Sequence, residues 1–300
     1  MLKFTNDQKT YNIADVQIGG QPWERPTVLI GSMFFAGDKI VQDPLKGIFD
    51  EEKARDLLKK EEEISKLTGN PRFIDVIGET PEALIKYIEF VASQTSAPIV
   101  VDSPSHNVRM ETIKYFSKTN LIPRLIYSSI GIEHNKEELD CIKKYGVKNA
   151  ILLAFSMKAM KPERKIELLE KNLIPAIKSA GVENIFIDTG VMDVASVSWV
   201  SLAIRDVKER FGYPTGCAPA NALYTWEKIK ELGKLAFHAA ASSVLSITPL
   251  FGADFCFYGP IKNAKWVYPA IAAIDGLIAY GGRIKGLRPT TNNHPLYKLF

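Results

Sequence analysis

The sequence has little of what disulfide-rich, exported or membrane-spanning proteins use. Its three cysteines, Cys141, Cys217 and Cys256, are far apart and odd in number, so we expect neither a disulfide framework nor a zinc site of closely spaced pairs. The first residues lack the apolar core of a signal peptide, and no run of about 18 uncharged apolar residues occurs. We therefore predict a cytoplasmic protein without a membrane span.

Several catalytic and binding motifs are also missing. There is no His-x-x-x-His pair and no Gly-x-Ser-x-Gly, so neither a protein-bound catalytic metal nor a serine nucleophile is expected. The glycines of GSMFFAG, after the first apolar run, are spaced too widely for a dinucleotide-binding turn, and no phosphate-binding P-loop follows.

Positive charge is modest and evenly distributed. The formal net charge is +4, and the lysine-rich stretch Lys53–Lys66 is balanced by Glu51, Glu52 and Glu61–Glu63. No aromatic residues interleave a basic run. We interpret this stretch as a solvated helix face, and nucleic acid is not an expected partner.

What is present is a regular alternation of short apolar runs and amphipathic stretches. The runs are rich in β-branched residues, and the segments between them include the helical patterns Pro81–Ser93 and Pro162–Ala180. The predicted strands are Thr27–Gly31, Phe73–Ile77, Ile99–Asp102, Leu125–Ser128, Ala150–Phe155, Asn184–Asp188, Pro214–Cys217 and Asp254–Tyr258.

Eight βα units within 300 residues, without a linker, predict an α/β fold: a single (β/α)8 TIM barrel forming one domain over residues 1–300. An open doubly wound sheet is the main alternative, and the missing glycine-rich turn disfavours it. The long first connection, from Phe34 to Arg72, is expected to form an extended loop at the barrel mouth before its helix.

Polar residues follow several of the predicted strands. In a barrel these positions face the active site. They are Asp75 and Glu79 at the second strand, Asp102, Ser103 and Asn107 at the third, Asp188 and Asp193 at the sixth, and Asn221 at the seventh.

Each of these residues has a structural and a functional interpretation. A single aspartate after a strand commonly caps the next helix. Asp102 and Asp188 end their runs in the same pattern, however, and a buried carboxylate needs a partner. A heterocycle with a 2-amino group beside a ring N–H offers two parallel donors that a carboxylate accepts as a pair. The residues thus predict a barrel that binds a flat, polar small molecule. His106 and His134 could also reach the mouth, whereas His238 is expected within a helix.

The run GSMFFAGDKIVQDP, the strand ends VDSPS and IDTGVMD, and the loop GCAPANA together resemble one family. It is the family of the H subunit of tetrahydromethanopterin S-methyltransferase, with its stand-alone bacterial relatives. Those relatives are similar to methylcobalamin:tetrahydrofolate methyltransferases of corrinoid-dependent demethylation pathways. The resemblance runs from about Thr10 to the C-terminus, and more distantly it extends to pterin-binding barrels such as dihydropteroate synthase.

The resemblance implies a pterin site. Asp102 and Asp188 would hold the aminopyrimidinone edge of the pterin, and Asn221 would lie near N5. Ser103 and Asp75 would be neighbours of this network. Asn221 and Asp188 are the predicted catalytic residues, and no residue is assigned to a metal.

The implied reaction is a methyl transfer between methylcobalamin and N5 of tetrahydrofolate, giving 5-methyltetrahydrofolate and cob(I)alamin. The chain lacks an Asp-x-His-x-x-Gly corrinoid motif, so a partner corrinoid protein is expected to supply this cofactor. A homodimer is expected by analogy alone. A lone barrel favours the bacterial type and hence tetrahydrofolate.

Three alternatives stay open. One is methyl transfer between methyl-tetrahydromethanopterin and a corrinoid. Another is a non-catalytic pterin-binding barrel. The last is condensation of a pterin pyrophosphate with an aminobenzoate, which would need a basic cradle where only Lys262 is near.

Overall fold

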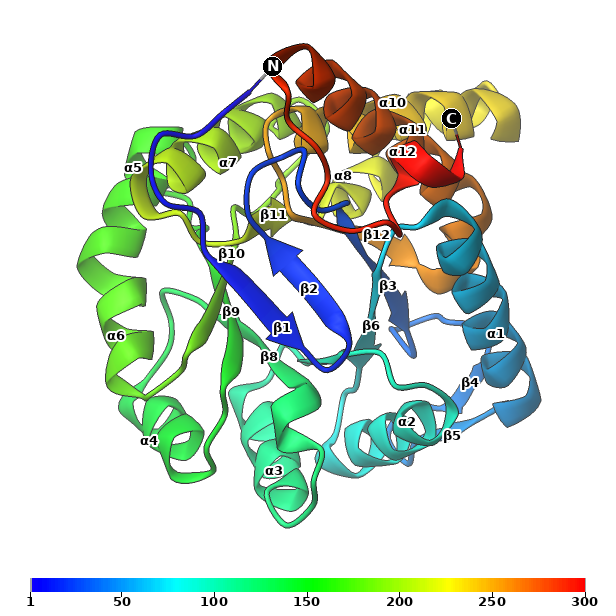
Figure 1. Cartoon of the computed structure of the whole chain (residues 1–300). Helices are drawn as coiled ribbons and strands as arrows, with labels where there is room; N and C mark the ends of the chain where they lie inside the picture. Colours follow the sequence, from blue (N-terminus) through cyan, green and yellow to red (C-terminus); the bar gives the residue numbers. More distant parts are fainter. Residues whose placement is uncertain (1, 300) are drawn as a thin grey trace.

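Eight parallel strands close into a barrel in the computed structural model, which describes residues 2–299. Each strand pairs with the one before and after it in this series, and the last pairs with the first (Figure 1). The barrel strands are β3 (Val28–Met33), β6 (Arg72–Ile77), β7 (Ile99–Asp102), β8 (Leu125–Ile130), β9 (Asn149–Leu153), β10 (Asn184–Asp188), β11 (Thr215–Cys217) and β12 (Phe255–Pro260). The predicted fold class is confirmed, and each of the eight predicted strands overlaps one of these.

Helices surround the barrel (Figure 1). Four of the α-helices within residues 2–299 begin where a side-chain cap satisfies a free backbone N–H, as Asp50 and Thr80 do at 3.1 Å from the amides of Lys53 and Ala83. The α-helices are α1 (Glu51–Thr68), α2 (Pro81–Gln94), α3 (His106–Phe116), α4 (Lys136–Lys144), α5 (Pro162–Leu168), α6 (Ile174–Ser179), α7 (Val197–Phe211), α8 (Pro219–Tyr224), α9 (Glu227–Glu231), α10 (Lys234–Leu250), α11 (Ala264–Gly282) and α12 (Pro295–Lys298). A π-helical turn, Leu169–Leu173, joins α5 to α6 in the region predicted as one helix.

The barrel interior is filled by alternate residues of the strands. Phe73, Val100 and Phe186 belong to one buried cluster inside the barrel, whereas neighbours such as Ile74, Val101 and Ile187 belong to the core shared with the helices. This follows from the two-residue period of a strand. The residue two positions after each inward apolar side chain therefore also points inward, at the carboxyl end of the strand.

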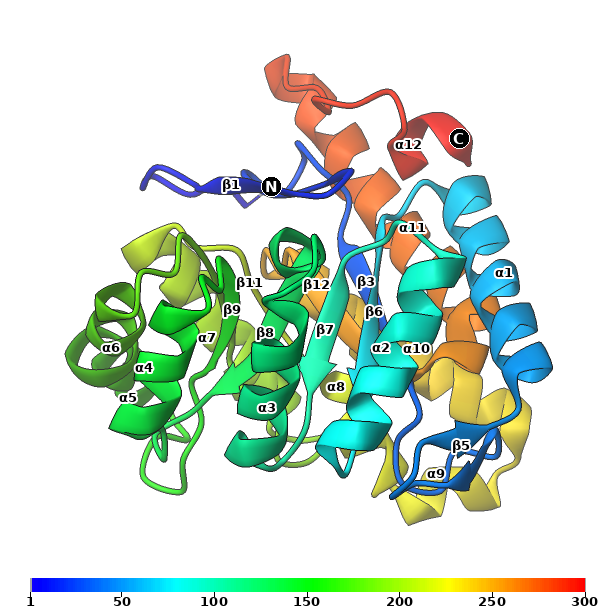
Figure 2. The ribbon, with the colours of Figure 1, turned by 90° about the horizontal axis from the view of Figure 1, so that it is seen from below.

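A hairpin absent from our sequence prediction closes the amino end of the barrel. It consists of β1 (Thr10–Ile13) and β2 (Val16–Gly19), and its Ile13 and Ile18 join the interior cluster. Figure 2 shows it at the opposite end of the barrel from β5 (Ile48–Phe49) and α9. The long first connection was predicted as an extended loop at the mouth. It contains a second short hairpin, in which β5 pairs with β4 (Val41–Asp43).

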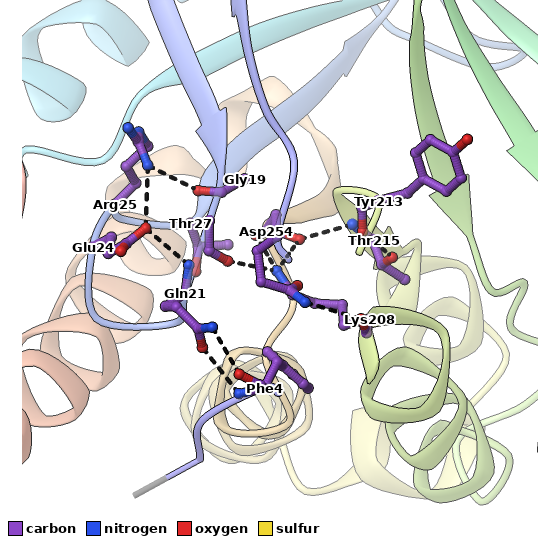
Figure 3. Close-up of polar contacts among 12 residues, drawn as sticks. Phe4, Gly19, Gln21, Glu24, Arg25, Thr27, Lys208, Tyr213, Thr215 and Asp254 are labelled. Atoms are coloured by element: carbon purple, nitrogen blue, oxygen red, sulfur yellow. Dashed lines mark hydrogen bonds and ion pairs between the residues drawn. The ribbon is translucent and has the colours of Figure 1, made fainter. Parts of the chain in front are cut away.

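Buried polar residues at the amino end form a closed network (Figure 3). The Lys208 ammonium lies 2.6 and 2.7 Å from the two carboxylate oxygens of Asp254 and 3.0 Å from the carbonyl oxygen of Gly20. The Thr215 amide donates to the same carboxylate at 2.8 Å. Every polar atom at the tip of this pair thus has a partner, as buried charges require.

One sequence interpretation is wrong in part. The Lys53–Lys66 stretch lies on α1 with most of its charges exposed, but Glu61 is buried. Its carboxylate lies 2.6 Å from the guanidinium of Arg72 and also accepts a bond from Tyr268. Glu61 therefore belongs to the helix–strand packing and not to the solvated face.

None of the helices within residues 2–299 combines the length and the apolar character needed to cross a membrane. The three cysteines are free thiols, with Cys217 and Cys256 buried.

Candidate functional site

A cavity of about 240 Å³ lies at the carboxyl ends of the barrel strands. It holds three carboxyl groups, from β6, β7 and β10, together with an amide from α8. The residues that line it are Ser32, Asp75, Ile77, Asp102, Ser128, Ser129, Leu153, Asp188, Ala218, Asn221, Phe257 and Gly259. Its size is below the roughly 300–1,000 Å³ typical of drug-sized ligand sites and suits one compact ring system.

Strand register brings the three aspartates together. Asp75 stands two residues after the inward Phe73, Asp102 two after Val100, and Asp188 two after Phe186. Because neighbouring parallel strands are in register, Asp75 on β6 pairs with Val100 on β7, one pleat before Asp102. The interior apolar layer thus ends in a layer of acids that faces the mouth.

Asp75 is the most deeply buried of the three acids and is only half satisfied. One carboxyl oxygen accepts a bond from the Ser32 hydroxyl at 2.6 Å, and the other has no partner within residues 2–299. Burial raises the pKa of Asp75 well above its usual range, the adjacent Asp102 raises it further, and the Ser32 bond opposes the rise. Burial and the charge of Asp102 thus favour the protonated form of Asp75, which can donate a hydrogen bond into the cavity.

Asp102 ends β7 beside the other two acids. Burial raises its pKa to about 6, the Arg109 guanidinium opposes the rise, and the charge of Asp188 adds to it. Arg109 itself is buried on α3, where it donates to the carbonyl oxygen of Ser103 and to Glu138. A positive charge behind Asp102 therefore keeps it ionised above about pH 6.

Asp188 ends β10 and has a cation near it. Its carboxylate accepts the Gly190 amide at 2.7 Å. Burial raises its pKa to about 6, and both the Gly190 bond and the Lys165 ammonium oppose the rise. Lys165 is buried on α5, where it donates to the carbonyl oxygen of Ala154 at 3.0 Å, and burial lowers its pKa to about 8.

The structure brings four of the five predicted site residues into one cavity: Asp75, Asp102, Asp188 and Asn221. Asn221 is an exposed residue of the short helix α8, at the cavity rim. Ser103 is not among the lining residues. Its hydroxyl instead accepts the Ser105 amide at 3.3 Å, next to the start of α3.

The other polar residues that follow strands lie outside the cavity. Asn107 lines a separate surface depression on α3, and Asp193 accepts the Ser196 amide at 2.7 Å in the turn before α7. His106 lies 2.7 Å from the buried Glu138, and His134 contacts the carbonyl oxygen of Gly131. His238 is on α10, as predicted, stacked on Trp266.

Sequence reasoning missed Ser32, Ser128 and Lys165. A signal existed for the two serines, since each stands two residues after an inward isoleucine, in the same register as the aspartates. Lys165 stands three residues before the buried Leu168, so helical periodicity places it on the inward face of α5.

The cavity can act as both donor and acceptor toward a flat ligand. Two carboxylates accept paired N–H groups, and Asp75 in its protonated form can donate. Within residues 2–299 no group of three or more histidine, cysteine or acidic side chains is arranged to hold a metal ion. The arrangement suits a heterocycle that presents N–H donors and a carbonyl or ring acceptor on one edge.

The fold and the site define a (β/α)8 barrel with an acidic small-molecule cavity at its mouth. The family model of the tetrahydromethanopterin S-methyltransferase MtrH subunit matches residues 6–289. The chain belongs to this family, as the sequence resemblance implied.

Curated relatives match over nearly the whole chain. The H subunit of tetrahydromethanopterin S-methyltransferase from Methanopyrus kandleri is 36% identical over 96% of both chains. The same subunit of Methanothermobacter thermautotrophicus is 34% identical over the full length of both. The H subunit of a putative mtx methyltransferase from Methanosarcina barkeri is 33% identical over 99% of both. These relatives are named as methyltransferase subunits, which supports a methyltransferase here.

Solved structures with the same fold include dihydropteroate synthases. The enzyme of Yersinia pestis with a pterin–sulfa conjugate superposes with a TM-score of 0.61 at 14% identity, covering 91% of this chain and all of that one. The enzyme of Xanthomonas albilineans with 7,8-dihydropteroate gives 0.60 at 17% identity, covering 90% and 98%. At these identities the likeness concerns the fold alone.

Proposed function

We propose that this protein moves a methyl group between N5 of a tetrahydropterin and a corrinoid held by a partner protein. The observation that carries the proposal is the convergence of Asp75, Asp102 and Asp188 on one small cavity with Asn221 at its rim, in a chain of a methyltransferase family. The names of the relatives favour tetrahydromethanopterin as the pterin, ahead of the tetrahydrofolate that our sequence analysis put first.

The residues have distinct roles in this proposal. The carboxylates of Asp102 and Asp188 accept the N–H groups of the aminopyrimidinone edge, and the protonated Asp75 donates to an acceptor of the same ring. Burying both ring and carboxylates makes each bond specific, because an unpaired buried partner is costly. The ring is thereby fixed with its N5 side toward the rim.

Asn221 stands where N5 meets the exterior. Its amide can donate to N5 or accept from it, so it can serve both the methylated and the free pterin. When methyl-pterin is the donor, N5 must lose electron density before the carbon–nitrogen bond breaks, and a donor hydrogen bond supplies part of that activation. The corrinoid supplies the cobalt centre that gives or takes the methyl group.

The cavity is large enough for the pterin ring alone, so the corrinoid must approach from outside the barrel. The partner protein would seat it over the rim, in line with N5. Holding the two reactants in line replaces a chance encounter by a fixed geometry, which is the main contribution of a protein to such a transfer.

The first experiment follows the visible spectrum of methylcobalamin under anaerobic conditions with purified protein and either tetrahydromethanopterin or tetrahydrofolate. Pterin-dependent loss of the methylcobalamin band establishes the reaction class, and the faster pterin identifies the substrate. A spectrum that is unchanged with both pterins, while either pterin binds, would favour the non-catalytic binding module.

Two variants separate the proposed roles. Asn221→Ala should lower kcat by about a hundredfold with little change in pterin affinity, whereas Asp188→Ala should weaken pterin binding by about a hundredfold. Asn107→Ala is the matched control, since Asn107 is exposed outside the cavity. Equal effects of both variants on both parameters would contradict this division of roles.

We also propose that the chain forms a homodimer through α10 and α11, which pack against each other. Residues 235–253 contain no lysine, arginine, aspartate or glutamate, and within residues 266–282 the single charged residue, Asp275, is buried. Large side chains are nevertheless exposed there, with Leu277 57% and Tyr280 59% exposed. In a two-fold interface a face meets its own copy, so a face without charge avoids like-charge contacts.

Light scattering coupled to size exclusion tests this second proposal. The wild-type chain should have twice the protomer mass, and Leu277→Glu should be monomeric with unchanged pterin affinity. Leu67→Glu, at a leucine of α1 that is 63% exposed, is the matched control and should stay dimeric. A monomeric wild-type chain would overturn the homodimer and leave this face to another subunit.

A further inference from the structure

A buried ion pair joins α3 to α4 outside the ring of strands. The guanidinium of Arg109 lies 2.7 Å from the carboxylate of Glu138, and both residues are buried. We call these two residues the mouth pair. The Tyr127 hydroxyl donates to the same carboxylate at 2.6 Å, and Nδ1 of the half-buried His106 lies 2.7 Å from its other oxygen. Buried ion pairs add little net stability, so stability alone does not account for this one.

Glu138 stands in the first turn of α4, where a glutamate usually has another role. Asn135 caps this helix by accepting the Glu138 amide at 2.9 Å. A glutamate three residues after a cap commonly reaches back to the amide of the capping residue. The carboxylate of Glu138 instead turns into the protein and meets Arg109. Its position is therefore explained by the arginine that it holds and not by the start of the helix.

Arg109 connects the mouth pair to the acidic cavity. One guanidinium nitrogen bonds to Glu138, and the other donates to the carbonyl oxygen of Ser103, the residue directly after Asp102. Ser103 is 1% exposed, and its hydroxyl accepts the Ser105 amide, so this backbone is held from both sides. The guanidinium thus fixes the chain at the point where the Asp102 side chain leaves it.

A second pair of the same composition lies away from the cavity and allows a comparison. Arg72 and Glu61 are also buried, with the guanidinium 2.6 Å from the carboxylate and the Tyr268 hydroxyl donating to it. We call these two residues the amino-end pair, because Arg72 begins β6. The other guanidinium nitrogen of Arg72 bonds to Thr95 at 2.6 Å, at the end of α2. The two pairs thus share their core arrangement, but the mouth pair also bonds to the backbone beside a site acid.

We infer that Arg109, held by Glu138, is a positioning residue for the methyl transfer, which fixes the end of β7 so that the Asp102 carboxylate meets the edge of the pterin. The inference rests on the proposed function and deepens it. Arg109 is not among the residues that line the cavity, so it acts through Asp102. Two parallel hydrogen bonds to a planar edge need a carboxylate held at one position and angle, which its supporting contacts provide. The positive charge of Arg109 also favours the ionised carboxylate that accepts these bonds.

The charges around Asp102 determine the sign of each expected change. Burial raises the pKa of Asp102 to about 6, Arg109 lowers it, and the charge of Asp188 raises it; Asp75 on β6 is the other acid beside it. Loss of the guanidinium charge therefore raises the pKa of Asp102. Loss of the Glu138 charge leaves Arg109 without its counter-ion and lowers that pKa. The two members of the mouth pair thus act on Asp102 with opposite signs.

The test uses the full-length double variant Arg109→Met/Glu138→Gln, with no corrinoid present. Removing both charges of a buried pair together leaves neither uncompensated, and the glutamine can still bond to Tyr127 and His106, so urea denaturation should show a stability close to that of wild type. The probe is whichever of tetrahydromethanopterin and tetrahydrofolate binds wild type more tightly. Fluorescence titration across pH 5–8 should show about tenfold weaker binding at pH 7 and a midpoint about one pH unit higher.

Two single substitutions separate position from charge. Arg109→Lys keeps the charge but lacks the planar fork that reaches both partners, so the pterin should bind more weakly with an unchanged midpoint. Glu138→Gln should move the midpoint downward, opposite to the double variant. Loosened packing alone would not give midpoint shifts of opposite sign. If the double variant does not fold, these two variants decide the question, and wild-type affinity and midpoint in both would overturn the inference.

The matched control is Arg72→Met/Glu61→Gln, which removes the amino-end pair in the same way and should bind the pterin as wild type does. A double variant at the mouth that binds as this control does, with the wild-type midpoint, would show that the mouth pair only packs α3 against α4. Equal weakening in both double variants would assign the effect to a general loss of packing and would also overturn the inference. If wild type binds neither pterin, the proposed function fails, and this inference fails with it.

Discussion

The two ends of the barrel differ in the partners that they provide for buried acids. At the amino end, Asp254 bonds to Lys208 and to the Thr215 amide, and Asp275 accepts bonds from Thr27 and Asn70. At the carboxyl end, one carboxyl oxygen of Asp75 has no partner among the described residues 2–299. Acids are buried or half-buried at both ends, so the difference lies in their partners. One end is completed by the chain itself, and the other is left for a ligand to complete.

This difference has an energetic meaning. Burial raises the pKa of Asp254, and the Lys208 ammonium opposes that rise at close range. At the mouth, burial raises the pKa values of Asp102 and Asp188 to about 6, and the charge of Asp188 adds to the rise at Asp102, although Arg109 and Lys165 oppose these rises. The mouth therefore stores unfavourable free energy in the unliganded protein, which bound N–H donors would relieve.

The largest expected effect is a loss of stability when Asp254, at the amino end of the barrel, is replaced. Asp254→Asn removes the carboxylate and leaves the buried Lys208 ammonium uncompensated, so the free energy of unfolding should fall by about 3–5 kcal/mol. Urea denaturation at pH 7 measures this. Asp140→Asn, at an exposed position of α4, is the control and should change stability by less than about 0.5 kcal/mol. A loss at Asp254 as small as that of the control would show that the network contributes nothing.

The corresponding substitution at the mouth, Asp188→Asn, should instead raise the free energy of unfolding. The folded pKa of Asp188, about 6, exceeds its ordinary value of 3.8, so the native state binds more protons than the unfolded chain between these pH values. Wild-type stability attributable to Asp188 is thus lost as the pH rises from about 4 to about 6, and Asp188→Asn should be more stable at pH 7 by about 2–3 kcal/mol.

Urea denaturation of the Asp188→Asn variant and wild type at pH 4 and pH 7 isolates this term, because the other titrating groups cancel in the difference. The two proteins should differ little at pH 4 and diverge by pH 7. Pterin binding should weaken in the variant despite its higher stability. If the Asp188→Asn variant is less stable than wild type at pH 7, the ionised Asp188 stabilises the fold as Asp254 does, and the proposed difference between the two ends is wrong.

The smallest expected effect is a change in the pH dependence of pterin binding when the buried Lys165, near Asp188, is replaced. Because the ligand needs an ionised Asp188, pterin affinity should fall as the pH drops through about 6. Lys165 lowers the pKa of Asp188, so Lys165→Met should move the midpoint of this fall upward by about one pH unit. Fluorescence titration of pterin binding across pH 5–8 measures the midpoint, with exposed Lys158→Met as control. An unchanged midpoint would separate Lys165 from the site.

Much of the fold could be predicted from the sequence because strand ends are marked by a change from apolar to polar residues. Ile99–Asp102 and Asn184–Asp188 were predicted with the bounds that the structure has. Both end on an aspartate, so the same residue marks the strand boundary and provides the site. Asp102 and Asp188, two of the four predicted site residues that line the cavity, were found for this reason.

The features that were missed depend on tertiary contacts. The β1–β2 hairpin has only Ile13 and Ile18 as buried apolar side chains of its strands, too few to distinguish a short strand pair from a loop. Glu61 stands among exposed charges, and only the folded chain brings Arg72 and Tyr268 to it. Ser103 follows its strand as the aspartates do, but it lies one residue out of their inward register.

The hairpin that closes the amino end has a consequence for how the chain is made. Its flanking segment bonds to residues about two hundred positions later: the Thr5 amide donates to Glu209 across a separation of 204 residues, and the Lys9 amide to the carbonyl oxygen of Gly212. Contacts of such sequence separation form late, since both partners must exist and the intervening chain must be ordered. The first residues of the chain are thus among the last to reach their native contacts, because their partners in and after α7 are synthesised about two hundred residues later.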